Sequence, residues 1–357
     1  MLAAEVKPTS SRLESLESLR GVAALIVVLH HMCGTIALPK NFGVDLFGGI
    51  FTPGQFGVDI FFVLSGFIIF YTNSKDKVGL QGIKKYTFRR IVRIYPVYWL
   101  ISIFYVPLVF LTPGTGPPTL DRTGAEVVHS LLLLPYKSGA PILGPAWSLC
   151  FEMMFYIMFI PFLIQRKLGW GVWCMWLGGV LAVQLTGTKF TNPYLTQFFS
   201  ELVLEFFLGM VVALLIRKHA VEKFGKWIFL GVALILVQLL VEWNLGKDGV
   251  PYRHMVYGLG SASLIYGLAC GDLKVGWNIS PFWRMIGLYS YSIYLIHLPI
   301  QQVLTKVAAK ILGNQQPEWV CYLLCLSIAT CSVVAGILLG RYFEQPVLKY
   351  YKKRIAG

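Results

Sequence analysis

Long apolar segments recur along almost the whole chain of 357 residues, and they limit what it can fold into. They begin near Leu19, Phe56, Tyr95, Trp147, Gly169, Gln197, Trp227, Arg253, Trp283 and Trp319. A helix needs about 20 largely apolar residues to cross a bilayer, so about ten spans are predicted. The sequence therefore predicts an all-α, polytopic integral membrane protein.

The composition excludes an ordinary soluble domain. Only 13% of the residues are charged and 56% are hydrophobic, whereas a soluble domain carries about 25% charged residues. The net charge is +14, but the basic residues gather at the ends of apolar spans, which is typical of membrane proteins. Membrane lipids, and not nucleic acid, are the expected surroundings. The seven cysteines show no metal-binding spacing, and no metal site is predicted.

Charge clusters between the spans predict the topology. They contain Lys7, Arg12 and Arg20, then Lys75 to Arg93, Arg166 and Lys167, Arg217 to Lys226, and the basic C-terminal residues. With ten crossings every cluster falls on the cytoplasmic side, with both termini. The apolar stretch from Val127 to Pro135 is too short to cross. We expect a cytoplasmic segment at 1–18, a membrane domain at 19–346 and a basic cytoplasmic tail at 347–357.

Ionisable residues inside spans are costly, and each one raises a functional hypothesis. In the first span, RGVAALIVVLHHMCG, Arg20 and His31 share one helix face, and His31 lies roughly 16 Å deeper, near the bilayer midplane. His30 points about 100° away from that face. A packed, hydrogen-bonded histidine is the alternative interpretation of both imidazoles.

The second span, within GQFGVDIFFVLSGFIIFY, contains one acidic residue and a pair of small residues. Asp59 is expected near the outer end of this span. Ser65 and Gly66 are expected deep in the membrane, where small residues allow helices to approach closely. A tight helix crossing explains Gly66 as well as a binding pocket does.

The stretch RRIVRIYPVYW places Arg90 and Arg93 on one helical face. Pro96 is typical of the first turn of a helix, so we expect the arginine pair just before a helix N-terminus. Helix N-termini favour anions, and the guanidinium group suits phosphate oxygens. Anchoring by the positive-inside rule is the alternative.

Three further motifs place polar residues in the membrane. Glu152 is expected roughly 7 Å into the fourth span, where it needs a partner and would orient a histidine, accept a substrate hydroxyl or form a structural salt bridge. His297 and Tyr294 are expected near the outer end of the ninth span, in an aromatic belt or a sugar-stacking surface. Glu344 is expected to bond a basic loop residue.

Taken together, the motifs resemble those of integral-membrane acyltransferases of the acyltransferase-3 type. SLRGVAALIVVLHH, GVDIFFVLSGF, FRRIVRIYPVYW, WSLCFEMMFY, SYSIYLIHLP and FEQP occur in family order from Arg20 to Pro346. The branch that the chain is most similar to modifies bacterial exopolysaccharides and lipopolysaccharide sugars. The family's first-helix histidine follows the arginine by eleven residues, which selects His31; His30 stands where an aromatic residue is usual.

The resemblance implies a function for each motif. His31 and Glu152 would be catalytic. Arg90, Arg93, Arg20, Ser65 and Gly66 would bind the donor; Asp59, His297 and Tyr294 are acceptor-side candidates. The donor would be a cytoplasmic acyl-coenzyme A, such as acetyl-CoA, with no permanently bound cofactor. The acceptor would be a sugar hydroxyl of a lipid-linked or growing polysaccharide at the bacterial inner membrane.

Two questions stay open at this point. His31 would act either as a general base towards the attacking hydroxyl or as a covalent carrier of the acyl group. The rival function is a proton-coupled small-molecule transporter that uses His31 and Glu152 as a proton relay.

Overall fold

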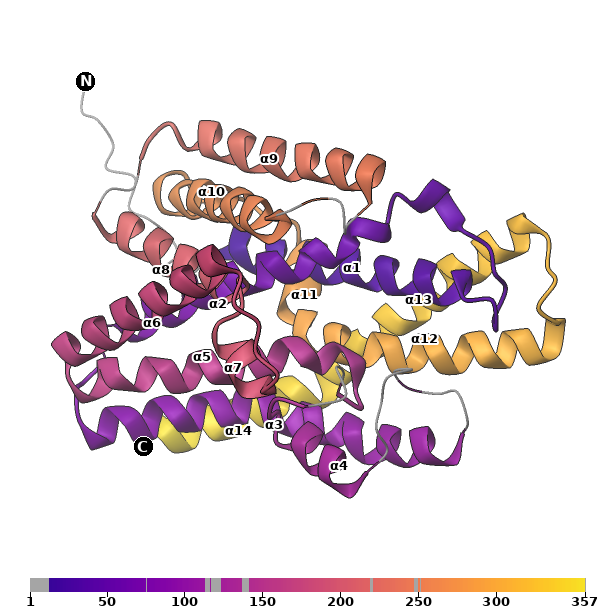
Figure 1. Cartoon of the computed structure of the whole chain (residues 1–357), viewed down its shortest axis with the longest axis horizontal. Coiled ribbons are helices and arrows are strands. Elements are labelled where there is room, and N and C mark those ends of the chain that lie inside the picture. Colours follow the sequence, from indigo (N-terminus) through magenta and orange to yellow (C-terminus); the bar gives the residue numbers. More distant parts are fainter. Residues whose placement is uncertain are drawn as a thin grey trace.

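The computed structural model describes residues 13–74, 76–112, 116, 123–136, 141–218, 221–246, 250 and 252–356. Within these ranges all regular structure is helical, which confirms the all-α prediction. Most of the long helices run side by side in one bundle, with α9 and α10 along one edge and α3 and α14 along the other (Figure 1).

The described chain contains fourteen α-helices and several short helical turns. The α-helices are α1 Glu14–Ala37, α2 Gly57–Asn73, α3 Leu80–Leu111, α4 Gly124–Leu131, α5 Trp147–Ile164, α6 Arg166–Thr186, α7 Pro193–Phe198, α8 Val203–Lys218, α9 Phe224–Leu245, α10 Arg253–Lys274, α11 Pro281–Leu288, α12 Ser290–Leu312, α13 Glu318–Leu339 and α14 Gln345–Ala356. Turns of 3₁₀-helix cover Leu46–Gly49, Thr52–Phe56 and Gly144–Ala146, and a π-helical turn, η5, covers Gly340–Glu344.

Eight segments of the described chain are long and apolar enough to cross a membrane. They are Glu14–Ala37, Thr52–Asn73, Leu80–Leu111, Gly144–Ile164, Arg166–Thr186, Pro193–Lys218, Phe224–Leu245 and Glu318–Lys353. The protein is therefore a multi-pass membrane protein. The other two predicted spans correspond to α10 and α12, which are long but more polar, so the count of ten stays a prediction.

The polar character of α12 has a structural cause. Five of its buried polar residues recur every three or four positions and line one face of the helix, whereas Ser292, also buried, lies off this row: the five are Ser290, Tyr294, His297, Gln301 and Thr305. The helix packs against α1, α3 and α13, and on this face His297 and Gln301 both contact α1. The predicted start of this span near Trp283 is wrong, because α11 ends at Leu288 and Tyr289 leaves the helical conformation before α12 begins.

The third span also differs from its prediction. Arg90 and Arg93 lie inside the long helix α3, which continues through Pro96, and do not precede a helix N-terminus. Proline removes one backbone hydrogen bond, but membrane helices tolerate it when neighbouring helices support the backbone. The arginines therefore project sideways from α3 into the bundle, and their anion binding cannot come from a helix end.

A close crossing of α2 and α8 fixes one wall of the bundle interior. A Cβ atom on Gly66 would lie 2.1 Å from the carbonyl oxygen of Phe206, and one on Gly209 would lie 2.0 Å from that of Val63. Such contacts require glycine on both helices. Gly66 thus has the packing role that the sequence left open beside a binding role.

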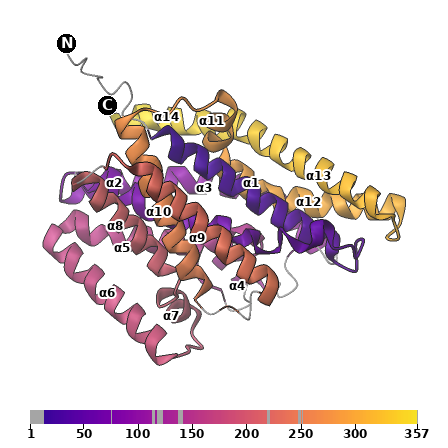
Figure 2. The ribbon, with the colours of Figure 1, turned by 90° about the horizontal axis from the view of Figure 1, so that it is seen from above.

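Both ends of the described chain lie at the same end of the bundle. In both views the start of α1 and the end of α14 lie towards the left-hand end of the bundle, although Figure 1 shows them separated across its width (Figures 1 and 2). An even number of crossings requires this arrangement. The assignment of that end to the cytoplasm stays a prediction from the charge clusters.

Candidate active site

An interior cavity of about 140 Å³ opens where α1, α2, α3, α5 and α12 meet. Six of the residues singled out in the sequence line it: Arg20, Ser65, Arg90, Arg93, Glu152 and Tyr294. These residues come from five helices spread over most of the chain. The motifs that lie far apart in sequence therefore form one site, and its walls bring three guanidinium groups to one carboxylate.

Glu152 is placed by a polar stripe on α5. Ser148, Glu152 and Tyr156 are four residues apart, and all three line the cavity. The Tyr156 hydroxyl donates a hydrogen bond to the Glu152 carboxylate, and the Ser65 hydroxyl donates a longer one of 3.4 Å from α2. Among the described residues the carboxylate has these two hydroxyl partners and forms no ion pair.

Arg90 is held between aromatic rings. Its guanidinium carbon lies 5.3 Å from the ring centre of Tyr86 and 5.1 Å from that of Tyr156. Cation–π contacts orient a guanidinium while leaving its N–H groups free to donate. Its Nε is buried and has no hydrogen-bond partner in the described part of the chain. Arg90 is therefore oriented towards the cavity with donors to spare.

Arg93 has a carboxylate partner. Its Nη1 lies 2.5 Å from Oε1 of Glu344, and its guanidinium lies over the ring of Tyr291. Glu344 is 1% exposed and also accepts a 2.6 Å hydrogen bond from Ser292. The expected partner of Glu344 was a basic loop residue, but Arg93 is on a helix. The π-helical turn η5 supplies this carboxylate, and such turns often occur at functional sites.

On α12, Tyr294 connects the cavity to two histidines. Its hydroxyl lies 2.8 Å from the Ser148 hydroxyl and donates to the Pro145 carbonyl oxygen at 3.0 Å. The ring centre of His297 lies 5.9 Å from that of Tyr294, and the ring centre of His31 lies 5.1 Å further on. His31 itself does not line the cavity, and this row of rings connects it to the cavity through His297 and Tyr294.

Hydrogen bonds assign the tautomers of the two histidines. Nδ1 of His297 lies 3.3 Å from the Ile293 carbonyl oxygen and must donate to it, which leaves Nε2 as an acceptor. Nδ1 of His31 lies 3.1 Å from this Nε2 and 3.1 Å from the Val27 carbonyl oxygen, so it carries the proton. Nε2 of His31 then keeps its lone pair and has no hydrogen-bond partner among the described residues. This arrangement suits a general base.

Besides His31, His297 and Glu344, three other residues noted in the sequence lie outside the cavity. Nδ1 of His30 donates to the Phe51 carbonyl oxygen at 3.0 Å, which is the local role expected of it. Gly66 packs against α8, as described above. Asp59 is buried at the start of α2 beside His254 and Glu205, away from the histidine pair.

Several residues of the site did not enter the sequence prediction. Tyr156 and Ser148 could have been found, because each stands four positions from Glu152. Tyr86, which stacks on Arg90, likewise stands four positions before it. The contact of His254 with Asp59 joins residues 195 positions apart, and no local pattern signals it.

Comparison with known proteins identifies the family of the chain. Residues 13–341 match the acyltransferase-3 family, described as an acyltransferase domain. The exopolysaccharide production protein ExoZ of Rhizobium meliloti (strain 1021) is 28% identical over 318 residues, which cover 86% of this chain and 93% of ExoZ. No solved structure matches the chain. The match spans nearly all of the membrane bundle and every residue of the cavity, and so the chain belongs to the acyltransferase-3 family and is a membrane O-acyltransferase.

Proposed function

We propose that this protein transfers an acyl group, in the first instance acetyl, from cytoplasmic acyl-coenzyme A to a hydroxyl of an exopolysaccharide or lipopolysaccharide sugar at the bacterial inner membrane. The observation that carries the proposal is the cavity in which Arg20, Arg90 and Arg93 face one acidic residue, Glu152, and which leads through Tyr294 to the histidine pair. The relative ExoZ, named for exopolysaccharide production, supports the choice of acceptor.

The cavity suits only part of a donor molecule. Pockets that enclose a drug-sized ligand measure roughly 300 Å³ or more, whereas this one measures about 140 Å³. The acyl and thiol end of the donor would enter it, and the phosphates would stay nearer the mouth. Arg90, whose buried Nε has no hydrogen-bond partner among the described residues, is the leading phosphate-binding residue, and arginine forks match phosphate oxygens.

The proposed chemistry uses the lone pair on Nε2 of His31, and it requires the thioester to extend past Tyr294 towards the histidine pair, because His31 itself does not line the cavity. The sugar hydroxyl oxygen attacks the thioester carbonyl carbon, a C–O bond forms and the C–S bond breaks. The hydroxyl proton passes to Nε2 of His31 and then to the departing thiolate, which leaves as the coenzyme thiol. Imidazole is suited to both transfers because the same ring nitrogen can accept a proton and later release it. A covalent acyl-histidine would instead be recovered as an acetylated peptide containing His31.

An apolar groove beside the site supports a lipid-linked acceptor. It lies between α3 and α12 and measures about 430 Å³. Ile296 and Pro299 line it and flank His297 along α12. A lipid chain in this groove would hold its sugar close to the histidine pair.

The test is mass spectrometry of the polysaccharide from source cells that lack the native gene and carry one variant. Wild-type protein should restore the acyl ester, and His31→Ala should not, because a general base contributes about 10²–10⁴-fold in rate. His30→Phe is the matched control and should keep most of the activity. Polysaccharide that is identical with and without the protein, or an active His31→Ala variant at equal abundance, would refute the proposal.

A further inference from the structure

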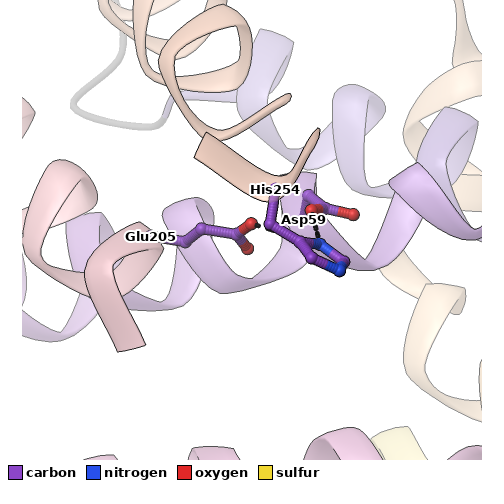
Figure 3. Close-up of side chains that lie close together, drawn as sticks. All are labelled: Asp59, Glu205 and His254. Atoms are coloured by element: carbon purple, nitrogen blue, oxygen red, sulfur yellow. Dashed lines mark hydrogen bonds and ion pairs between the residues drawn. The ribbon is translucent and has the colours of Figure 1, made fainter. Parts of the chain in front are cut away.

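A second cluster of polar residues lies apart from the cavity, where α2, α8 and α10 begin. It consists of Asp59, Glu205 and His254, each in the first turn of its helix (Figure 3). Nδ1 of His254 lies 2.6 Å from Oδ1 of Asp59 and 3.9 Å from Oε1 of Glu205. One possible ligand atom from each residue lies within 4.8 Å of the other two.

Glu205 lacks the partners that a buried carboxylate needs. It is 1% exposed, and neither of its oxygens has a hydrogen-bond partner within the described ranges. The neighbouring cation, Arg253, is already bound to Glu242 at 3.1 Å. A buried, uncompensated carboxylate is costly, and here a second carboxylate, Asp59 at 2% exposure, lies beside it. With His254 neutral, the cluster carries two negative charges and no positive one.

We infer that Asp59, Glu205 and His254 bind one divalent transition-metal ion, of the Zn²⁺ or Mn²⁺ type. Imidazole nitrogen favours transition metals over Mg²⁺ and Ca²⁺, and carboxylate oxygens complete a mixed N/O set. A bound dication neutralises the two carboxylates. With metal–ligand bonds of about 2.1 Å, ligand atoms stand roughly 3–3.5 Å apart. The observed separations of 2.6 and 3.9 Å bracket that range, so small side-chain rotations suffice.

Glu201 fits the position of an outer partner of this site. If Nδ1 of His254 binds the metal, its other nitrogen, Nε2, carries the proton, and Nε2 lies 4.0 Å from Oε1 of Glu201. Metal-binding histidines commonly donate this proton to a carboxylate. The ion would tie together the first turns of three helices. One of these is α2, which two residues after Asp59 begins to line the acyl-transfer cavity at Phe61.

The experiment measures metal in the purified full-length protein, in detergent, after dialysis against metal-free buffer. Elemental analysis should find close to one Zn²⁺ or Mn²⁺ per chain in the wild type. Glu205→Gln and Asp59→Asn should each lower the content at least tenfold. Asp272→Asn is the matched control, because this buried carboxylate lies at the other end of α10 and bonds Ser15; its metal content should equal that of the wild type.

A second measurement keeps the inference testable if the variants do not fold. After treatment with EDTA, the wild type should melt at a lower temperature, and adding Zn²⁺ or Mn²⁺, but not Mg²⁺ or Ca²⁺, should restore the melting temperature. A wild type with only trace metal and no response to added ions would overturn the site and leave a proton shared between Asp59 and Glu205. Equal metal in the wild type and Glu205→Gln would place the ion elsewhere. Neither readout depends on acyl transfer.

Discussion

The two arginines of the R-x-x-R motif have different structural roles. Arg93 neutralises the buried Glu344, whereas Arg90 lies between the rings of Tyr86 and Tyr156 and forms no ion pair among the described residues. Removing one member of a buried ion pair is more damaging than removing both, because the remaining charge is left uncompensated. The motif therefore combines one residue needed for stability with one that is free for the donor.

This difference predicts two kinds of variant. Arg90→Ala should weaken coenzyme A binding by about 1.5–3 kcal/mol, the scale of a charged hydrogen bond, with little change in melting temperature. Arg93→Ala should also cost about 3 kcal/mol of stability, because Glu344 is left unpaired. Calorimetry and thermal unfolding of the purified protein measure the two effects. Adding Glu344→Gln to Arg93→Ala should restore stability without restoring affinity; equal stability of both single variants would contradict the assignment.

His297 is predicted to act as a positioning residue for His31. His297→Ala removes the acceptor that fixes the Nδ1–H tautomer of His31, so kcat should fall by about 10-fold to 100-fold, part of the contribution of a general base. The affinity for coenzyme A should not change. His297→Gln offers an amide oxygen in place of the ring nitrogen and should restore part of kcat. An unchanged kcat in His297→Ala would show that the contact has no role in the reaction.

At the residue scale, the sequence predicts which polar side chains belong to the candidate site. It predicts less well which of these side chains contact one another. His31, Arg90, Arg93 and Glu152 stand out because each is an ionisable group in or beside an apolar span. The pairing of Arg93 with Glu344 spans 251 positions, and that of His297 with His31 spans 266. Such contacts depend on how whole helices pack, which local periodicity does not encode.

At the scale of elements, the length of each apolar segment predicts that a helix is present. It does not predict where that helix begins and ends. The start of α5 at Trp147 agrees with prediction, because Pro145 and the preceding 3₁₀ turn mark it. The start of α3 lies fifteen residues before the predicted Tyr95, since its first turns are basic and amphiphilic rather than apolar. Hydropathy detects the part of a helix that crosses lipid and misses the part that extends into water.

The crossing of α2 and α8 yields a prediction about packing. Gly66→Ala would place a methyl group 2.1 Å from a backbone oxygen, so the two helices must separate. Overpacking of this kind costs on the order of 1–3 kcal/mol, and thermal unfolding should show the loss. Gly178→Ala in α6 is the control: nothing lies within 4 Å of its added Cβ, and alanine favours the helix by about 0.8–1.0 kcal/mol. Equal melting temperatures for the two variants would contradict the close crossing.

At the scale of the whole molecule, the polar residues of the cavity and those of the proposed metal site lie at different depths in the bundle. Arg90 and Arg93 of the cavity belong to the part of α3 that follows its basic first turns, and the residues of the proposed metal site lie at the starts of α2, α8 and α10. In the predicted topology the first group faces the cytoplasm and the second faces outward. The enzyme would then draw its donor from one side and meet its acceptor at the other, with the histidine pair between them.

That topology can be tested with single cysteines. The exposed native cysteines Cys174 and Cys331 would first be replaced by serine, because they would react with the label. Cysteines placed at Lys84 and Lys353, both exposed, should react with a membrane-impermeant maleimide only after the cells are opened. A cysteine at Lys189, exposed in the turn between α6 and α7, should react in intact cells that have a permeable outer envelope.

The experiment tests whether the number of membrane crossings between the two lysine positions is even or odd. Lys84 precedes most of the bundle and Lys353 follows all of it, so the two sites share a side only if the number of crossings between them is even. Eight crossings from α3 onwards place both in the cytoplasm, and these include α10 and α12, the two helices that composition alone does not mark as spans. If only one of the two helices failed to cross, the two lysine positions would label from opposite sides. If neither α10 nor α12 crossed, the cysteines at the two lysine positions would still label from the same side. A further cysteine at Lys274, exposed at the end of α10, distinguishes this outcome, because that position is predicted to be cytoplasmic only if α10 crosses.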